Sequence, residues 1–460
     1  MGNKWDIVKL DEIAKNASRA FNFKNKNGVI FINTGDVLDG KFLHKNISKI
    51  NELPGQAKKA IKINDILFSE IRPGNSRFAL VNFENTHNYV VSTKFMILEV
   101  NQDVMNLEFF YLQLTCKQTL SDFQHIAESR SGTFPQITFD SISHYPFYCP
   151  DKVAQVKIKN FLGLITKNLE TCYQINQTLE QISQTLFKSW FVDFDPVIDN
   201  ALDGGNTIPE PFQARAELRK KVRNSADFKP LAADVRALFP AEFEEIELGW
   251  VPKGWQLSMA GDEFVIRGGS TPSTANADFW DNGEIHWTSP KDLAGNTSKI
   301  LIDTSKKITT AGLNKISSGL LPENTVLMSS RAPIGYLALT KIPLAINQGY
   351  IAIPSAKSLS SEYIIYWLEN IMDDIKGIAG GTTFAEISKS AFKTINLIIP
   401  SQKAIEVFTH IAKDNFDKIV ENSKQTTVLK NLRDTLLPKL ISGELSLDDI
   451  PELYQETETI

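Results

Sequence analysis

The sequence of 460 residues has few of the features that mark secreted, membrane-bound or metal-binding proteins. Its three cysteines, Cys116, Cys149 and Cys172, are scattered and form no Cys-x-x-Cys pattern, so neither a disulfide framework nor a zinc site is indicated. We expect them to be buried as small apolar side chains. No apolar run approaches the length of a membrane span, and the first residues do not resemble a signal peptide. We therefore expect a cytoplasmic protein without membrane contact.

The common enzyme motifs are also missing. The sequence contains no Gly-x-x-x-x-Gly-Lys-Ser/Thr phosphate loop, no His-Glu-x-x-His, no Gly-x-Ser-x-Gly, and no Asn/Asp-Pro-Pro-Tyr/Phe tetrapeptide of amino-methyltransferases. The six histidines show no metal-ligand spacing. We expect no catalytic residue, no metal and no cofactor in this chain.

The charge pattern gives no strong footprint of a nucleic-acid-binding protein. The net charge is −5, which argues mildly against such binding. The excess acid is concentrated in residues 191–254 and 401–460. Residues 1–150 and 255–400 are near neutral, so either of these two segments could carry a locally basic face. A modest intrinsic DNA affinity, supplemented by partner proteins, fits this distribution best.

The chain contains a long internal repeat. Trp5 returns as Trp255, and residues 131–137 (SGTFPQI) return as residues 381–387 (GTTFAEI), in each case displaced by 250 residues. Between these anchors the match drifts by a few residues, as insertions in surface loops would cause. A period of this length is far beyond that of solenoid repeats. The sequence therefore predicts two similar modules, which suits a protein that recognises something bipartite.

The length and the 42% hydrophobic content fit a globular chain of several domains. We expect a mixed α/β (α+β) protein in which each module is followed by a long helix. The predicted segments are a first module (1–150), a central helix (151–190), a connector (191–254), a second module (255–400), a distal helix (401–445) and an acidic tail (446–460).

Alternating apolar residues bounded by Gly, Asn and Pro predict short strands in both modules. Helical spacing predicts one helix in each module, over 107–120 and 362–375, and a short helix over 212–222. The connector shows no periodicity strong enough for a core, and we expect its role to be mechanical. The predicted strands are 29–33, 66–69, 89–91, 95–98, 326–329, 344–346 and 350–353.

The two long helices carry apolar residues that alternate steps of four and three, which is a heptad seam. The distal helix repeats the register of the central one with more polar interruptions. At about 36 residues each helix would be about 54 Å long. Two such seams most simply pack on each other, antiparallel; the alternative is that each packs on its own module. The predicted seam residues are Ile158, Leu162, Ile165, Leu169, Leu179, Leu186, Phe408, Ile419, Leu429 and Leu436.

Polar loops recur at matched places in the two modules. They carry the side chains that hydrogen-bond base edges and phosphates, together with glycines that let the backbone approach a phosphate. Taken singly, each loop is more often an ordinary turn, so the recurrence carries the argument. The predicted DNA-binding residues are Arg72, Asn75, Ser76, Arg77, Lys94, Arg130 and Thr133 in the first module, and Arg267, Ser270, Thr271, Lys291, Ser330, Arg331, Asn347, Gln348, Thr382 and Thr383 in the second. Arg72 and Arg77 are the expected counterparts of Arg331.

These residues resemble the specificity (S) subunits of type I restriction–modification systems, over essentially the whole chain. The second module matches that family's target-recognition pattern in residues 267–273 (RGGSTPS), 279–280, 285–288, 291–293, 329–335 (SSRAPIG), 346–349 (INQG) and 380–384 (GGTTF). Residues 186–196 (LFKSWFVDFDP) and 437–444 (LPKLISGE) resemble the ends of its two spacer helices. The first module departs from the pattern, because Ala17, Ser18 and Arg19 stand where the second has Arg267, Gly268 and Gly269.

The resemblance implies two target-recognition domains separated by antiparallel coiled-coil spacer helices in a pseudo-twofold arrangement. Each domain would read one half of a split site in double-stranded DNA, and the helices would set the gap and bind two modification subunits. Those subunits would supply S-adenosylmethionine-dependent adenine methylation, and restriction (motor-nuclease) subunits would use ATP and Mg²⁺. The rival interpretations are a self-contained DNA methyltransferase or nuclease with a duplicated reader, and a coiled-coil scaffold without a DNA role.

Overall fold

The computed structural model describes residues 5–130, 132–295, 298–380 and 385–447. The chain divides into two compact units. Unit 1 comprises residues 1–169 and 427–460, and unit 2 comprises residues 170–426. Each unit contains one of the two modules together with a part of each long helix, α5 (Lys152–Phe191) and α15 (Gln402–Ser442).

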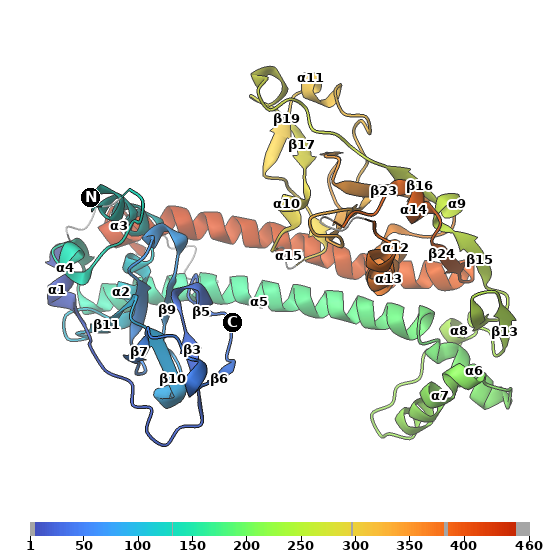
Figure 1. The fold of residues 1–460 in the computed structure, drawn as a ribbon, viewed down its shortest axis with the longest axis horizontal. Coiled ribbons are helices and arrows are strands. Elements are labelled where there is room, and N and C mark those ends of the chain that lie inside the picture. The colour runs from blue at the N-terminus through green and yellow to red at the C-terminus, as the bar shows by residue number, and fades with distance from the viewer. Residues whose placement is uncertain (1–4, 131, 296–297, 381–384, 448–460) are drawn as a thin grey trace. The chain divides into compact units, whose positions relative to one another are not determined.

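The first module, in unit 1, is built from two four-stranded sheets and short helices (Figure 1). One sheet has the order β2 (Ala14–Asn16), β11 (Phe95–Val100), β8 (Ile66–Ser69), β9 (Phe78–Leu80). The other has the order β6 (Ile47–Lys49), β3 (Gly28–Ile32), β10 (Tyr89–Ser92), β7 (Ala57–Ala60). Two-stranded ribbons pair β1 (Asp6–Lys9) with β12 (Pro146–Cys149) and β4 (Val37–Leu38) with β5 (Lys41–Phe42). The helices are α1 (Leu10–Ile13), α2 (Leu107–Leu114), α3 (Lys117–Arg130) and α4 (Phe139–Ile142).

The second module, in unit 2, repeats this plan. Its larger sheet has the order β16 (Phe264–Arg267), β23 (Tyr350–Ala356), β20 (Val326–Ser329), β21 (Leu337–Thr340), β18 (Ile300–Leu301). Its smaller sheet has the order β19 (Lys306–Ile308), β17 (Ile285–Thr288), β22 (Ala345–Ile346), and a ribbon pairs β15 (Gln256–Met259) with β24 (Asn396–Ile399). The helices are α9 (Ala260–Glu263), α10 (Pro290–Leu293), α11 (Thr310–Leu313), α12 (Ser361–Asn370), α13 (Met372–Gly377) and α14 (Lys389–Lys393).

The predicted repeat is confirmed in the strand pairing. β1 and β12 of the first ribbon and β15 and β24 of the second are displaced by the same 250 residues as the sequence anchors. β10 runs parallel to β3, as β22 does to β17, and β11 lies between β2 and β8, as β23 lies between β16 and β20. The two modules therefore share one scaffold.

Each predicted module helix is instead two helices. α2 ends at Leu114 and α3 begins at Lys117, and Ile371 separates α12 from α13. Apolar spacing that continues across a bend cannot be distinguished by periodicity from that of one straight helix. The expectation of buried cysteines is confirmed for Cys172 alone, since Cys116 and Cys149 are partly exposed.

The predicted antiparallel pairing of the long helices is seen in unit 2, where α5 and α15 run side by side (Figure 1). The Asn422 amide donates to Asn176 Oδ1 (2.8 Å) and the Asn415 amide donates to Ser183 Oγ (2.9 Å). The residue numbers rise along one helix as they fall along the other, which defines an antiparallel pair. Phe187 on α5 also contacts Phe408 on α15.

The predicted seam residues are buried or partly buried. In unit 1, Ile158, Leu162, Ile165 and Leu169 share one core with Leu429 and Leu436 and with the first module. In unit 2, Leu179, Leu186, Phe408 and Ile419 share another with the second module. The seam therefore packs on the partner helix and on a module at once, so the two alternatives weighed for it are both realised.

The connector was expected to lack a core, and this expectation is wrong. It folds into α6 (Asp195–Gly204), α7 (Glu210–Arg223), α8 (Ala233–Arg236) and a hairpin of β13 (Phe243–Ile246) and β14 (Gly249–Pro252). Val197 and Phe239 are buried in the same core as Trp190 of α5 and Trp255. The connector is thus a packed part of unit 2.

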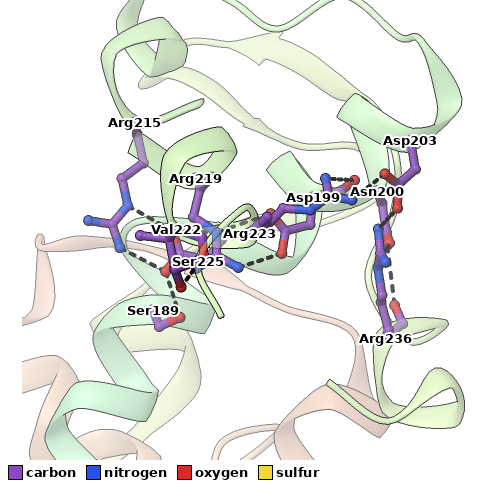
Figure 2. A network of polar contacts seen from close by, with 11 residues as sticks. Ser189, Asp199, Asn200, Asp203, Arg215, Arg219, Val222, Arg223, Ser225 and Arg236 are labelled. Atoms are coloured by element: carbon purple, nitrogen blue, oxygen red, sulfur yellow. Dashed lines mark hydrogen bonds and ion pairs between the residues drawn. The ribbon is translucent and has the colours of Figure 1, made fainter. Parts of the chain in front are cut away.

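Three acidic residues of α6, spaced four apart, face three arginines of α7 with the same spacing (Figure 2). Arg215 donates two hydrogen bonds to Asp195, both 2.7 Å long, and Arg219 pairs with Asp199 in the same bidentate way. Ser189 of α5 also donates to Asp195 (2.8 Å). These acidic charges of the connector are therefore neutralised in pairs, which permits burial of Asp195 and Asp199.

Candidate nucleic-acid interface

The predicted loops of the second module are brought together by backbone hydrogen bonds. The Ser270 amide donates to Ile346 O (3.1 Å), and the Ser330 amide donates to Gly349 O (2.8 Å). The Ile387 amide in turn donates to Ser330 O (3.0 Å). Loops that are far apart in sequence thus form one continuous row at the ends of β16, β20 and β22. Thr382 and Thr383, also predicted, lie outside the described residues.

One of two adjacent glycines allows this row to close. A Cβ at Gly269 would lie 1.8 Å from the backbone oxygen of Ile346, so no other residue fits without moving the backbone. A Cβ at Gly268 would meet the end of the flexible Lys389 side chain, at 2.9 Å. Gly269 is therefore required by packing, whereas Gly268 is not.

The exposed polar side chains of this row are oriented by hydrogen bonds. Thr271 Oγ1 donates to Gln348 Oε1 (2.8 Å). Asn347 Oδ1 accepts a bond from the Gly349 amide (2.9 Å), which shapes the turn that presents Gln348. Gln348 and Thr271 are exposed. An amide held through its oxygen keeps its NH₂ group available as a donor to base acceptors.

Three cationic side chains lie on the segments next to these amides. Arg331 is partly exposed, and its guanidinium lies 3.7 Å from Glu386 Oε2. Lys291 is exposed on α10, whose first turn is closed by a capping box between Ser289 and Asp292. Burial works to raise the pKa of Asp292, but hydrogen bonds from Ser289 and Ser305 hold that pKa below its ordinary value. The carboxylate thus stays ionised and keeps α10 and Lys291 in place. Arg267 is exposed at the end of β16.

The first module forms the equivalent row. The Glu70 amide donates to Lys94 O (2.9 Å), and the Ile137 amide donates to Glu70 O (2.8 Å). Ser92 Oγ accepts from the Lys94 amide (3.2 Å), as Asn347 accepts from Gly349. Residues 92–94 therefore correspond to residues 347–349, as the sequence predicts.

The loop between β8 and β9 presents most of the remaining predicted residues of this module. Arg72 and Asn75 are exposed, and Arg72 and Ser76 have positive φ angles of 45° and 54°. The Arg72 amide donates to Pro135 O (3.0 Å), which places this loop beside the segment that carries Thr133. Arg130 and Thr133 are exposed at and after the end of α3.

Three of the sequence assignments need correction. Ser330 is 3% exposed between two backbone hydrogen bonds, so its side chain presents little surface to a ligand. Ile71, not Arg72, is the counterpart of Arg331, because Ile71 pairs with Gln136 as Arg331 pairs with Glu386. Arg77 NH1 donates to Gly35 O and Val37 O (3.0 and 2.9 Å), so this guanidinium ties its own loop to η1 (Thr34–Asp36) and β4.

Arg19 stands in the sequence where the second module has the last glycine of its Arg-Gly-Gly pattern. Its carbonyl accepts a hydrogen bond from the Ala60 amide of β7 (2.8 Å), and its guanidinium is paired with Asp65 and, at 2.7 Å, with Glu99. Burial raises the pKa of Asp65, and the hydrogen bonds from the Lys62 amide and from Arg19 oppose that rise. This arginine therefore serves the interior of the module.

Some residues of the site were missed by the sequence. The Lys389 side chain reaches Gly268, and the Lys315 carbonyl accepts a bond from Ser270 Oγ (3.1 Å). Lys389 directly follows Ser388, the N-cap of α14. A basic residue near a polar loop is the sequence signal by which Lys389 could have been found. Among the described residues, no group of three His, Cys, Asp or Glu could hold a metal ion. No helix of the described chain is long and apolar enough to cross a membrane.

Two stretches of the chain, residues 2–181 and 252–429, match the family model of the type I restriction modification DNA specificity domain. The type I restriction enzyme HindI specificity subunit of Haemophilus influenzae is 38% identical over 460 residues, 96% of this chain and 99% of that protein. The MjaIX specificity subunit of Methanocaldococcus jannaschii is 35% identical over 205 residues, 43% of this chain and 46% of that protein. The crystal structure of the type I restriction–modification S subunit from M. genitalium has the same fold, with a TM-score of 0.51, 16% identity and 96% of both chains covered.

Proposed function

The chain belongs to the family of type I restriction–modification specificity subunits, and we propose that its two modules each read one half of a bipartite site in double-stranded DNA. The observation that carries this proposal is the repeated row of loops on one scaffold with different side chains. Arginine and glutamine stand in the row at 331 and 348, where the first module has isoleucine and threonine at 71 and 93. Base-reading groups that differ on a common frame suit two unlike half-sites.

The proposed partners follow from the family. Two modification subunits bind the spacer helices and supply S-adenosylmethionine-dependent adenine methylation, and restriction subunits supply ATP- and Mg²⁺-dependent translocation and cleavage. This chain contributes recognition and no catalytic step. Its exposed cations, among them Arg72, Arg130, Lys291 and Arg331, contact phosphates or bases.

The test is to express the chain with its modification subunits and to sequence the methylated positions in genomic DNA. The proposal expects one split sequence with a constant gap, and competition by random duplex that is at least about tenfold weaker than by that site. Methylation by this chain without any partner would support a self-contained methyltransferase. Equal competition by all duplexes would support a scaffold without a DNA role.

We further propose that α5 and α15 act as a ruler between the half-sites. The hydrogen bonds of Asn176 with Asn422 and of Ser183 with Asn415 hold the antiparallel helices in one register. Deleting residues 172–178 together with 422–428 removes one heptad from each helix and keeps the seam in phase. One heptad is about 10 Å, or about three base pairs.

The double deletion is expected to shorten the preferred gap by about three base pairs with both half-sites unchanged. Circular dichroism and co-purification with the modification subunits control for folding and assembly. A folded, assembled deletion protein that methylates the original sequence with its original gap would refute the ruler.

A further inference from the structure

One buried carboxylate connects the spacer helix α5 to the second module. Glu180 is 9% exposed. Its Oε1 accepts hydrogen bonds from Ser298 Oγ (2.8 Å) and from the Lys299 amide (3.0 Å), both in the segment that leads into β18. The backbone oxygen of Glu180 also accepts a bond from the Tyr366 hydroxyl of α12 (3.4 Å). A single residue of α5 is thus held by two separate elements of the module.

The Lys299 ammonium completes this arrangement. It lies 3.6 Å from Glu180 Oε2 and 3.1 Å from Glu369 Oε1 of α12, and 5.7 Å from the centre of the Tyr366 ring. Its side chain is 17% exposed. We call Glu180, Ser298, Lys299, Tyr366 and Glu369 the helix clamp. It joins α5, the β18 edge of the large sheet and α12 through charge-assisted hydrogen bonds.

Toward α5, the other described contacts of this module are largely apolar. Toward α15, Lys341 pairs with the exposed Asp417 (3.7 Å) and Thr409 donates a hydrogen bond to Ser360 (2.8 Å). Phe187, Tyr363, Tyr366 and Phe408 pack ring against ring, with centroids 4.9 to 6.3 Å apart. Such contacts stabilise the unit but have little directional preference. Hydrogen bonds to a buried carboxylate are directional, and a buried charged pair adds little net stability because desolvation offsets its attraction. The clamp is therefore better suited to fixing an orientation than to holding the unit together.

The clamp also lies behind the candidate interface. A cavity of about 340 Å³ is lined by Glu180, Lys299 and Glu369 of the clamp together with Leu293, Gly335 and Tyr336. Leu293 ends the helix that carries Lys291, and residues 335–336 end the loop that carries Arg331. The clamp and the elements that carry the two recognition loops thus line one cavity.

We propose that Glu180 is a positioning residue, which fixes the orientation of the second module on the spacer helix and thereby the gap at which the second half-site is accepted. This inference rests on the proposed bipartite recognition. Loss of Glu180 leaves the base-reading side chains in place but lets the module rotate or slide on its apolar contacts. The half-site sequence should persist while the selectivity for one gap is lost.

The experiment measures binding of the assembled complex to duplexes that carry the methylated site with the original gap or with a gap one or two base pairs longer or shorter. Glu180→Ala is expected to weaken binding at the original gap about tenfold and to leave the other gaps nearly unchanged, so that the preference disappears. Glu180→Gln keeps an acceptor for Ser298 and the Lys299 amide, and should restore part of the preference. Glu170→Ala, an exposed glutamate on the same helix, is the matched control.

An unchanged gap preference in a folded Glu180→Ala complex would overturn the inference, as would an equal loss at all gaps, which indicates simple destabilisation. If Glu180→Ala fails to fold, the gap preference of Glu180→Gln is measured instead. A gap preference identical to that of Glu170→Ala would contradict the role of the clamp. Failure of the proposed function is recognised separately, since the unmodified complex would then show no preference for a split site.

Discussion

The two modules differ at corresponding points of their repeated sequence. In the second module, Gly269 brings its backbone against Ile346 O, and a Cβ there would lie 1.8 Å from that oxygen. In the first module, Arg19 stands 250 residues earlier; its carbonyl accepts a hydrogen bond from Ala60 of β7, which pairs with β10, and its guanidinium pairs with Asp65 and Glu99. The segment after the first strand of the sheet is therefore anchored by close backbone contact in one module and by a partly buried ion pair in the other.

The attachment of the modules to the long helices also differs. The second module holds α5 through the buried carboxylate of Glu180. Within unit 1, the first module holds α5 through a neutral group, because the buried Gln155 accepts a hydrogen bond from the Asn106 amide through its Oε1 (2.7 Å). The Lys117–Asp434 pair between α3 and α15 is largely exposed, and such pairs contribute little because water and salt screen them. A duplicated fold thus conserves strand order while the local means of fixing its loops and helices diverge, which is the condition for reading two unlike half-sites.

The largest effect is expected from Gly269→Ala, which would force the backbone apart at Ile346. We expect the unit that contains the second module to lose about 3 kcal/mol or more. Reading of one half-site should be lost while the other is retained. Gly268→Ala is the control, because its Cβ meets only the movable end of Lys389. Denaturant unfolding and binding to single half-sites measure both effects; equal behaviour of the two variants would contradict the proposed backbone closure.

A somewhat smaller, pH-dependent loss is expected from Arg19→Ala, about 2–3 kcal/mol at neutral pH, because Asp65 remains buried without this partner. Burial already raises the pKa of Asp65. For a carboxyl whose pKa is raised on folding, stability is greatest below the unfolded-state pKa and falls as pH rises through the folded-state value. The deficit of Arg19→Ala should therefore shrink between about pH 7 and pH 4. Urea unfolding at both pH values tests this, and a constant deficit would argue against Asp65 as the cause.

Arg331→Ala is expected to leave stability nearly unchanged and to weaken DNA binding by about 1–3 kcal/mol if the guanidinium reads a base. A phosphate contact would instead weaken all sequences alike and lower the salt slope by about one. Arg77→Ala, whose guanidinium is bound to Gly35 and Val37 carbonyls, should lower stability more than specificity. Binding isotherms at several salt concentrations separate these results. Unchanged affinity and specificity of Arg331→Ala would remove it from the interface.

The sequence predicted the duplicated scaffold, the antiparallel helices and the matched loops, because these depend on periodicity and on recurrence at a constant displacement. It failed where burial depends on partners distant in sequence. The connector was expected to lack a core, yet Asp195 and Asp199 are buried, because arginines 20 residues away pair with them. Ser330 and Arg77 belong to residue types found in recognition loops. In the folded chain, however, backbone groups distant in sequence hydrogen-bond to the main chain of Ser330 and to the guanidinium of Arg77.

The central claim, that each module reads its own half-site, is tested most directly by exchanging residues 255–400 for the corresponding module of another family member. The hybrid, assembled with its modification subunits, is then used to map methylated positions in genomic DNA. One half of the methylated sequence is expected to change to that of the donor while the other half stays the same. A change in both halves, or in neither, would contradict this claim.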